Sequence, residues 1–337
     1  MDVFGELDDG RVVQRVHLTG HGLSANVMTW GAVLQDLRLD GFGHSLVLGF
    51  SEFAHYPARS PKFGAIVGRV ANRIRNGEAK IGGRVYPFDK NVLDRHTLHG
   101  GSAGAGKRIW DVEETGADFV TLSQILPDGH MGFPGNMTVH ATYRIAPGPV
   151  LEIEISAISD ADTLCNFASH SYFNLDGGGD ARRQFFQVDA DHFLTLDEDL
   201  VPTGEVASVE GTQFDFSSAR PLLLGKAGLS GEAGYDNNLC LSRHRTDCRQ
   251  VARLKGAVSG IEMRIETTEP GLQVYDGSKI GARTEDVPGL NGAPYQAFSG
   301  IALEPQAWPD APNQDWADQV RLAAGETYRQ TTRFVFG

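Results

Sequence analysis

Apolar and polar residues alternate along several short stretches of this chain. In residues 138–145 the odd positions are apolar and the even positions are polar, and residues 151–157 repeat the pattern. A period of two places alternate side chains on opposite faces of a β-strand. The Ala-Pro-Gly-Pro segment at 146–149 predicts a turn, so the two strands should form a hairpin. Residues 260–266 alternate in the same way and predict a further strand.

The same pattern surrounds a pair of glycines at 82–83. Residues 80–86 therefore predict two strands joined by a two-residue turn. Helical periodicity is almost absent: one turn is predicted at 52–56, and no window has a sustained apolar stripe with helical spacing. These patterns exclude a parallel α/β fold and predict an all-β protein. A large antiparallel β-sandwich is favoured, because strands with one apolar face pack in two layers.

Glycine and proline are spread along the whole chain. The 41 glycines and 15 prolines interrupt the strands at short intervals and do not gather in one linker. No repeat with a fixed period of roughly 20–50 residues occurs, which disfavours propellers and solenoids. Residues 1–337 are therefore expected to form a single domain. With 41% hydrophobic residues, a chain of this length buries roughly three quarters of its unfolded surface, which excludes disorder.

The net charge is −13, which argues against a surface that binds nucleic acid. The amino-terminal segment is acidic and lacks the apolar run of a secretory signal, and no apolar stretch approaches the roughly 18 residues that span a bilayer. The cysteines, Cys165, Cys240 and Cys248, form no Cys-x-x-Cys pair, which disfavours a disulfide framework or a thiolate zinc site. We therefore expect a cytoplasmic protein with reduced thiols and with neither nucleic acid nor membrane as partner.

A glycine-rich segment at 101–107 fits the first seven positions of a phosphate-binding P-loop. The eighth position needs a Ser or Thr hydroxyl for magnesium, but Arg108 stands there. Residues 109–113 predict a strand, whereas a P-loop leads into a helix whose amino end faces the phosphate. Nucleotide binding is therefore disfavoured.

Three residues able to move a proton lie in apolar or glycine-rich surroundings, where such groups are costly to bury unless they are satisfied. His170 lies among aromatic residues, where a satisfied core histidine is the commoner explanation. His99 precedes two glycines, a place where the backbone can approach a ligand closely. Glu304 ends an apolar stretch and is followed by Pro305. Burial would raise the pKa of Glu304 toward the range of a general base, unless the strand end is solvated.

Two further segments offer groups that anchor ligands. Asn72 and Arg73 lie in a hydrophobic stretch, and Asp236 follows Tyr235 in a polar turn. Arginine and aspartate together hold several hydroxyls of a polar small molecule. From composition alone, a structural ion pair explains these residues equally well.

Taken in order, these segments resemble the aldose 1-epimerase (galactose mutarotase) family over nearly the whole chain. That family has an early Asn-Arg pair, a Leu-His-Gly-Gly loop, a Ser-His-x-Tyr-Phe-Asn-Leu segment, a Tyr-Asp turn and a late glutamate near Pro-Asp and Asn. The matching residues here are Asn72, Arg73, His99, His170, Asp236 and Glu304, followed by Pro309, Asp310 and Asn313. The resemblance implies a galactose mutarotase-like supersandwich, which agrees with the strand pattern.

The resemblance also implies an isomerase that interconverts the α and β anomers of a free hexose or pentose. In it, Glu304 is the general base at the C1 hydroxyl, and His170 is the general acid at the ring oxygen, where His99 assists. One base and one acid suffice for ring opening, so neither a metal nor a redox cofactor is expected. The pH profile should be bell-shaped, with Glu304 setting the acid limb and His170 the alkaline limb.

By the same resemblance, Arg73, Asp236, Asn72 and Gln306 bind the sugar. Two departures from the family pattern leave the preferred sugar open. The loop after His99 has Gly-Ala-Gly-Lys at 104–107 in place of Gly-Phe-Asp-Lys, which suggests a wider site. Asp276 stands where a small hydroxyl residue is expected, which suggests a different hydroxyl contact.

Other functions fit parts of this pattern. A sugar-phosphate epimerase of the same fold needs several basic groups, and a net charge of −13 does not attract a dianion. A glycosidase or lyase would use paired carboxylates such as Asp236 and Glu304, which leaves the histidines without a role. A non-catalytic sugar-binding or sensing protein does not need a matched acid and base. The sequence allows either a monomer or a homodimer.

Overall fold

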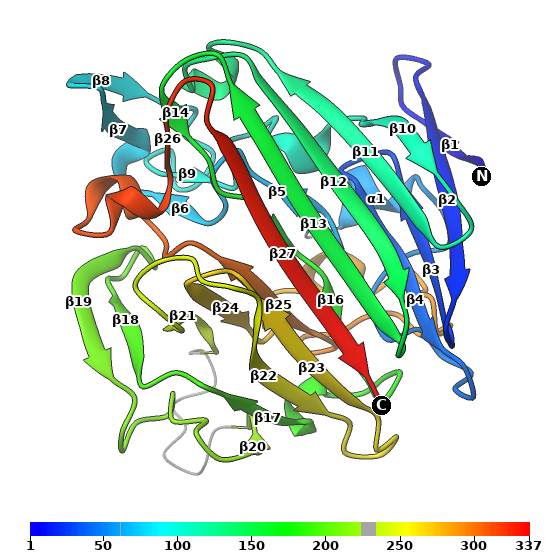
Figure 1. Cartoon of the computed structure of the whole chain (residues 1–337). Coiled ribbons are helices and arrows are strands. Elements are labelled where there is room, and N and C mark those ends of the chain that lie inside the picture. Colours follow the sequence, from blue (N-terminus) through cyan, green and yellow to red (C-terminus); the bar gives the residue numbers. More distant parts are fainter. Residues whose placement is uncertain (61, 224–233) are drawn as a thin grey trace.

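The computed structural model describes residues 1–60, 62–223 and 234–337, and most of its regular structure is antiparallel β-sheet (Figure 1). The largest sheet has nine strands in the order β10-β11-β12-β13-β27-β23-β22-β17-β20. These strands are β10 (Asp111–Thr115), β11 (Phe119–Leu126), β12 (Met137–Ala146), β13 (Val150–Ser159), β27 (Thr327–Phe336), β23 (Glu262–Thr267), β22 (Arg249–Lys255), β17 (Phe185–Val188) and β20 (Arg220–Pro221). The carboxyl-terminal strand β27 therefore lies inside the sheet, between β13 and β23.

A six-stranded sheet has the order β16-β25-β24-β21-β18-β19. Its strands are β16 (Tyr172–Phe173), β25 (Ile301–Gln306), β24 (Gly271–Tyr275), β21 (Asp236–Cys240), β18 (His192–Leu196) and β19 (Pro202–Ser208). A four-stranded sheet contains β1 (Asp2–Glu6), β2 (Val12–Gly20), β3 (Leu23–Met28) and β4 (Val33–Leu39). Two-stranded ladders join β5 (Ile66–Val67) to β15 (Ala168–Ser169), β6 (Arg73–Ile74) to β9 (Thr97–Leu98), β7 (Glu78–Ile81) to β8 (Arg84–Pro87), and β14 (Thr163–Leu164) to β26 (Arg321–Leu322).

One hydrophobic cluster joins the nine-stranded and six-stranded sheets. It includes Ile153 and Ile155 of β13 together with Leu303 of β25 and Leu272 of β24. The two sheets are thus layers of a sandwich with a shared core. Side chains on the opposite face of the six-stranded sheet point away from this core, which leaves that face available for polar groups.

The strand pattern of the sequence agrees with these elements. The predicted hairpin is the β12–β13 pair, with register from Met137 opposite Ser159 to Ala146 opposite Val150. The predicted strand at 260–266 is β23, and the two strands around the glycine pair are β7 and β8. The prediction of an antiparallel all-β fold is confirmed.

Helices are short in the described part of the chain. The turn predicted at 52–56 starts at the expected place, because the N–H of His55 donates to the carbonyl of Glu52. It then continues as α1 (His55–Arg59), three residues beyond the predicted start, and α2 (Gly281–Thr284) was not predicted. Within the described residues, no helix has the length and apolar character needed to cross a membrane.

Candidate active site

Glu304 lies on β25, a strand whose residues are all buried. Ile301 and Leu303 face the core between the sheets, so the period of two turns Glu304 and Gln306 to the opposite face. Glu304 pairs with Gln273 of β24, and its Oε2 atom has no hydrogen-bond partner among the described residues. The fold therefore holds a buried carboxyl group on a central strand with one oxygen unsatisfied.

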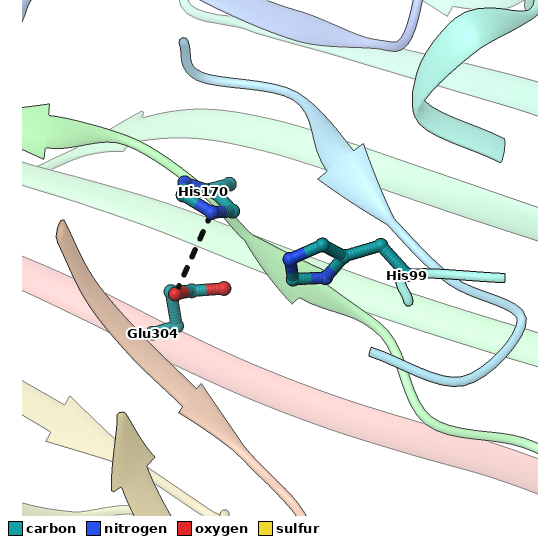
Figure 2. Close-up of side chains that lie close together, drawn as sticks. All are labelled: His99, His170 and Glu304. Carbon is teal, nitrogen blue, oxygen red and sulfur yellow. Dashed lines mark ion pairs between the residues drawn. The ribbon is translucent and has the colours of Figure 1, made fainter. Parts of the chain in front are cut away.

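His170 lies between β15 and β16, directly opposite this carboxyl group. Its N–H donates to the carbonyl of Ala65 at 2.8 Å, and its carbonyl accepts from the N–H of Gly64 at 3.0 Å. The ring Nε2 lies 3.7 Å from Glu304 Oε1 (Figure 2). That separation is longer than a hydrogen bond, so both groups can still bond a ligand. A buried acid–base pair results.

His99 follows β9 and has a φ of 52°. Its Nδ1 accepts a hydrogen bond from the N–H of Asn72 at 3.1 Å, and its own N–H donates to the carbonyl of Asn72 at 2.9 Å. Because Nδ1 is an acceptor, the ring proton lies on Nε2. The His99 ring is 5.2 Å from the His170 ring, centroid to centroid, and Figure 2 shows both rings beside Glu304. His99 therefore offers a second donor at the same place.

Burial sets the protonation of these groups. Desolvation, reinforced by the negative charge of Asp236, raises the pKa of Glu304 to about 8. Desolvation also lowers the pKa of His170 to about 3 and holds that of His99 well below its usual value. The raised pKa of Glu304 agrees with the sequence analysis, but its order relative to His170 is the reverse of the expected one. At neutral pH, therefore, the Glu304–His170 pair holds one proton.

Arg73 and Asp236 meet beside this pair. Arg73 Nη2 lies 3.4 Å from Asp236 Oδ2, and Gln273 Nε2 donates to Asp236 Oδ1 at 2.7 Å. Arg73 Nε has no hydrogen-bond partner among the described residues. The two residues thus form an ion pair, as one reading of the sequence allowed, and also keep bonding capacity for a ligand.

Several buried amide groups around the site also lack partners in the described part of the chain. Neither amide atom of Gln306 is bonded, and Asn238 Oδ1 and Gln273 Oε1 are likewise unsatisfied. Register places Glu304, Gln273 and Asn238 opposite one another on adjacent strands, hence on one face. Buried polar groups without partners cost free energy. This face is therefore suited to a ligand rich in hydroxyl groups.

Other residues singled out in the sequence hold the site residues in place through hydrogen bonds. The side-chain carbonyl of Asn72 accepts from the N–H of Arg73 at 2.8 Å, so Asn72 orders both His99 and Arg73. The N–H of Asp310 donates to the carbonyl of Arg73 at 2.9 Å, and Asn313 Nδ2 donates to Asp310 Oδ1 at 2.9 Å. The late Pro-Asp and Asn segment therefore braces Arg73.

Sequence reasoning missed two residues of this region, Gln273 and Lys62. Gln273 had a usable signal, because a polar residue interrupts the apolar strand β24. Lys62 had none, because a single lysine between proline and phenylalanine is ordinary in a surface turn. Its place becomes visible only when the chain is folded, since Lys62 and His99 line one cavity.

The two departures from the family pattern also have structural explanations. The Asp276 carboxylate accepts from the N–H groups of Tyr235 and Ser278, each at 3.1 Å, so it stabilises the start of β21. The polar turn predicted at Asp236 is wrong, because Asp236 is the first residue of that strand. The glycine-rich segment ends in a short 3₁₀ turn (Ala105–Lys107), and no helix follows it before β10. It lines a cavity of only about 10 Å³, room for roughly one water molecule, so it adds little width to the site.

His99, His170 and Glu304 have their possible metal-binding atoms within 4.8 Å of one another. Two histidines and a carboxylate are common metal ligands. Binding through His99 Nε2 would move the ring proton to Nδ1, which would then face the N–H of Asn72 instead of accepting from it. The positive charges of Lys62 and Arg73 near Glu304 also oppose a further cation. The donor set therefore fits a proton-transfer site better than a metal site.

A family model described as aldose 1-epimerase matches residues 14–335. The chain belongs to the aldose 1-epimerase family. Among family members, the mouse protein named galactose mutarotase is 39% identical, and the alignment covers 99% of this chain and 97% of that protein. The Haemophilus influenzae aldose 1-epimerase is 32% identical, with 97% of each chain covered.

Solved structures of similar proteins have the same fold as this chain. A Caenorhabditis elegans aldose epimerase homologue superimposes with a TM-score of 0.88 at 32% identity, covering 96% of this chain and 99% of the other. The galactose 1-epimerase of Lactobacillus acidophilus gives a TM-score of 0.84 at 27% identity, covering 99% and 97%. The resemblance stated from the sequence is therefore confirmed for family and fold.

Proposed function

We propose that this member of the aldose 1-epimerase family interconverts the α and β anomers of a free hexose or pentose by acid–base ring opening and closure. The observation that carries the proposal is the buried Glu304–His170 pair, whose facing atoms lie 3.7 Å apart. Around it lie buried polar atoms without partners in the described residues. A monosaccharide presents enough hydroxyls to satisfy them.

The reacting form has Glu304 as a carboxylate and His170 as an imidazolium. This form holds the same number of protons as the resting pair, because moving one proton from Glu304 to His170 interconverts the two. Glu304 removes the proton from the C1 hydroxyl, and the C1–O1 bond becomes a carbonyl. The bond from C1 to the ring oxygen breaks as His170 gives its proton to that oxygen. The aldehyde rotates about C1–C2, and closure on the other face reverses both transfers.

The remaining groups bind and orient the sugar. His99, protonated on Nε2, donates a hydrogen bond to the ring oxygen. Arg73 and Asp236 hold ring hydroxyls, with charge-assisted bonds that fix direction as well as position. The free amide of Gln306 and the Asn72 amide supply further contacts. Neither a metal nor a redox cofactor takes part in these steps.

A neutral sugar suits this site better than a sugar phosphate. Glu304 and Asp236 both contribute carboxyl groups, and Arg73 is already paired with Asp236. These carboxyl groups would repel a phosphate dianion, and the charge of Arg73 is already balanced by Asp236. Because the mouse relative is named galactose mutarotase, galactose is the first sugar to test.

Polarimetry of freshly dissolved α-anomers tests the proposal. We expect at least one free hexose or pentose to mutarotate faster than in buffer, and the matched Glu304→Gln variant to lose that acceleration. Galactose, glucose, xylose, arabinose and glucose 6-phosphate make a suitable panel. If sugars bind but none reacts faster, the protein is a sensor. If only the phosphorylated sugar reacts faster, it is a sugar-phosphate epimerase.

The cellular compartment of the protein is also part of this proposal. A cytoplasmic location is supported by the free thiols Cys165, Cys240 and Cys248, which suit a reducing compartment. Fractionation of the source cells, followed by immunoblotting, tests it. Recovery in the exported or membrane fraction contradicts it.

A further inference from the structure

Lys62 begins a tight turn that is attached to the segment carrying His170. The N–H of Ala65 donates to the carbonyl of Lys62 at 3.2 Å. The next residues of the turn bond directly to His170. The N–H of Gly64 donates to the carbonyl of His170 at 3.0 Å, and the N–H of His170 donates to the carbonyl of Ala65 at 2.8 Å. These bonds fix the backbone of Lys62 relative to the Glu304–His170 pair.

The side chain of Lys62 lines the small cavity beside His99, together with Lys107. Lys62 is half-buried, and its ammonium group forms no hydrogen bond or ion pair with any residue that the structure describes. A cation withdrawn from water without a partner costs free energy. The ammonium is therefore available to bond an oxygen of a ligand.

The charges around Lys62 show which part of the site it faces. Glu304 is its strongest charged neighbour, ahead of Lys107, Arg73 and Asp236, and both histidines are also close enough to feel its charge. Burial lowers the pKa of Lys62 to about 7, so the group is cationic below that pH. Asp236 is already paired with Arg73, whereas Glu304 Oε2 has no hydrogen-bond partner among the described residues.

We propose that Lys62 is a further catalytic residue, which donates a hydrogen bond to the anomeric oxygen O1 of the sugar. The inference rests on the proposed function, in which Glu304 removes the proton from that oxygen. Negative charge develops on O1 as the proton leaves, and an adjacent ammonium stabilises it. In ring closure the same N–H polarises the C1=O1 carbonyl toward attack by the sugar hydroxyl. Lys62 transfers no proton, so the bonds made and broken are unchanged.

Kinetics of three variants test the charge and its position. Lys62→Met removes the ammonium at similar length, and kcat at about pH 6, below the pKa of Lys62, should fall roughly 10²-fold, as for loss of one oxyanion donor. Lys62→Arg keeps a donor and should retain more activity than Lys62→Met. Lys107→Met is the matched control, because Lys107 lines the same cavity but is exposed; its kcat should stay near wild type. Equal kcat in wild type and Lys62→Met overturns the proposal.

Binding of an analogue without O1 separates this role from a structural one. With galactose as substrate, the analogue is 1,5-anhydrogalactitol, and calorimetry measures both dissociation constants. Lys62→Met should weaken galactose binding about tenfold and leave the analogue unchanged, because only galactose has the contacted atom. Equal weakening of both ligands, or of neither, overturns the proposal. If the wild type binds neither ligand and accelerates no sugar, the proposed function itself has failed.

Discussion

The strands β13 and β25 lie on either side of the same core and follow opposite rules. Along β13 buried positions alternate with partly exposed ones, and the buried positions are mainly aliphatic. Along β25 every residue is buried, including Glu304 and Gln306. The first pattern stabilises the sandwich, since its polar side chains reach water. The pattern of β25 leaves side-chain polar atoms of Glu304 and Gln306 without hydrogen-bond partners in the described structure.

This difference shows where the molecule accepts a free-energy cost. Each unsatisfied buried polar group costs on the order of 1–3 kcal/mol. We call β13 the outer strand, which avoids this cost, and β25 the inner strand, which does not. A fold retains such groups where a ligand completes their bonding. Substitutions of Glu304 and Gln306 in β25 should therefore affect catalysis much more than stability, and substitutions of the buried aliphatic residues of β13 should do the reverse.

The sharpest test of the inner strand is Glu304→Gln. It keeps the size of the side chain but removes the proton acceptor, so kcat should fall by about 10⁴-fold, the upper range for one acid–base group. Sugar binding, measured by calorimetry, should largely persist. Turnover near wild type would exclude Glu304 as the base.

The pH profile sharpens the same point. Because Glu304 has a pKa of about 8 and His170 a pKa of about 3, the pair holds one proton between these values and loses it above about pH 8. In Lys62→Met, which lacks the ammonium that titrates near pH 7, kcat should therefore still fall above about pH 8, and this alkaline limb belongs to Glu304. Burial thus reverses the assignment expected from the sequence. A residual rate in Glu304→Gln that keeps the limb assigns it to another group.

The acid partner should show a smaller loss. His170→Ala removes the proton donor, so kcat should fall roughly 10²- to 10⁴-fold. The thermal unfolding midpoint should change little, because the backbone bonds of His170 to Gly64 and Ala65 do not need the ring. An unfolded variant would show instead that His170 is a core histidine, the alternative that the sequence left open.

The outer strand provides the converse experiment. Ile153 of β13 is 2% exposed in the shared core, and Ile153→Ala should lower the free energy of unfolding by about 2–5 kcal/mol. Its kcat at 25 °C should remain within about twofold of wild type, since Ile153 lies on the far side of the core from Glu304. Urea unfolding and polarimetry on the same sample measure both. A large kcat loss in a folded variant would break the contrast between the strands.

The same contrast explains what the sequence could predict. Alternation of apolar and polar residues identified β12, β13 and β23, because each strand has one buried face and one face that is partly exposed to solvent. The resemblance supplied Glu304, His170, His99, Arg73 and Asp236, which the fold brings close together. It could not supply the order of the pKa values, because desolvation depends on packing from distant segments. Lys62 was missed for the same reason, since its neighbours come from β25, β21 and the His99 loop.

The smallest expected effect is that of a chelator. The two histidines and Glu304 lie close enough to suggest a metal, but His99 Nδ1 is engaged by the N–H of Asn72, which keeps the ring proton on Nε2. A metal at Nε2 would displace that proton and set two N–H groups against each other. We therefore expect EDTA, followed by gel filtration into metal-free buffer, to leave kcat unchanged within error. Loss of activity that a single divalent metal restores would contradict this tautomer and make the three residues ligands. A matched sample without chelator controls for losses during filtration, so a decrease in both samples would not count against the metal-free reaction.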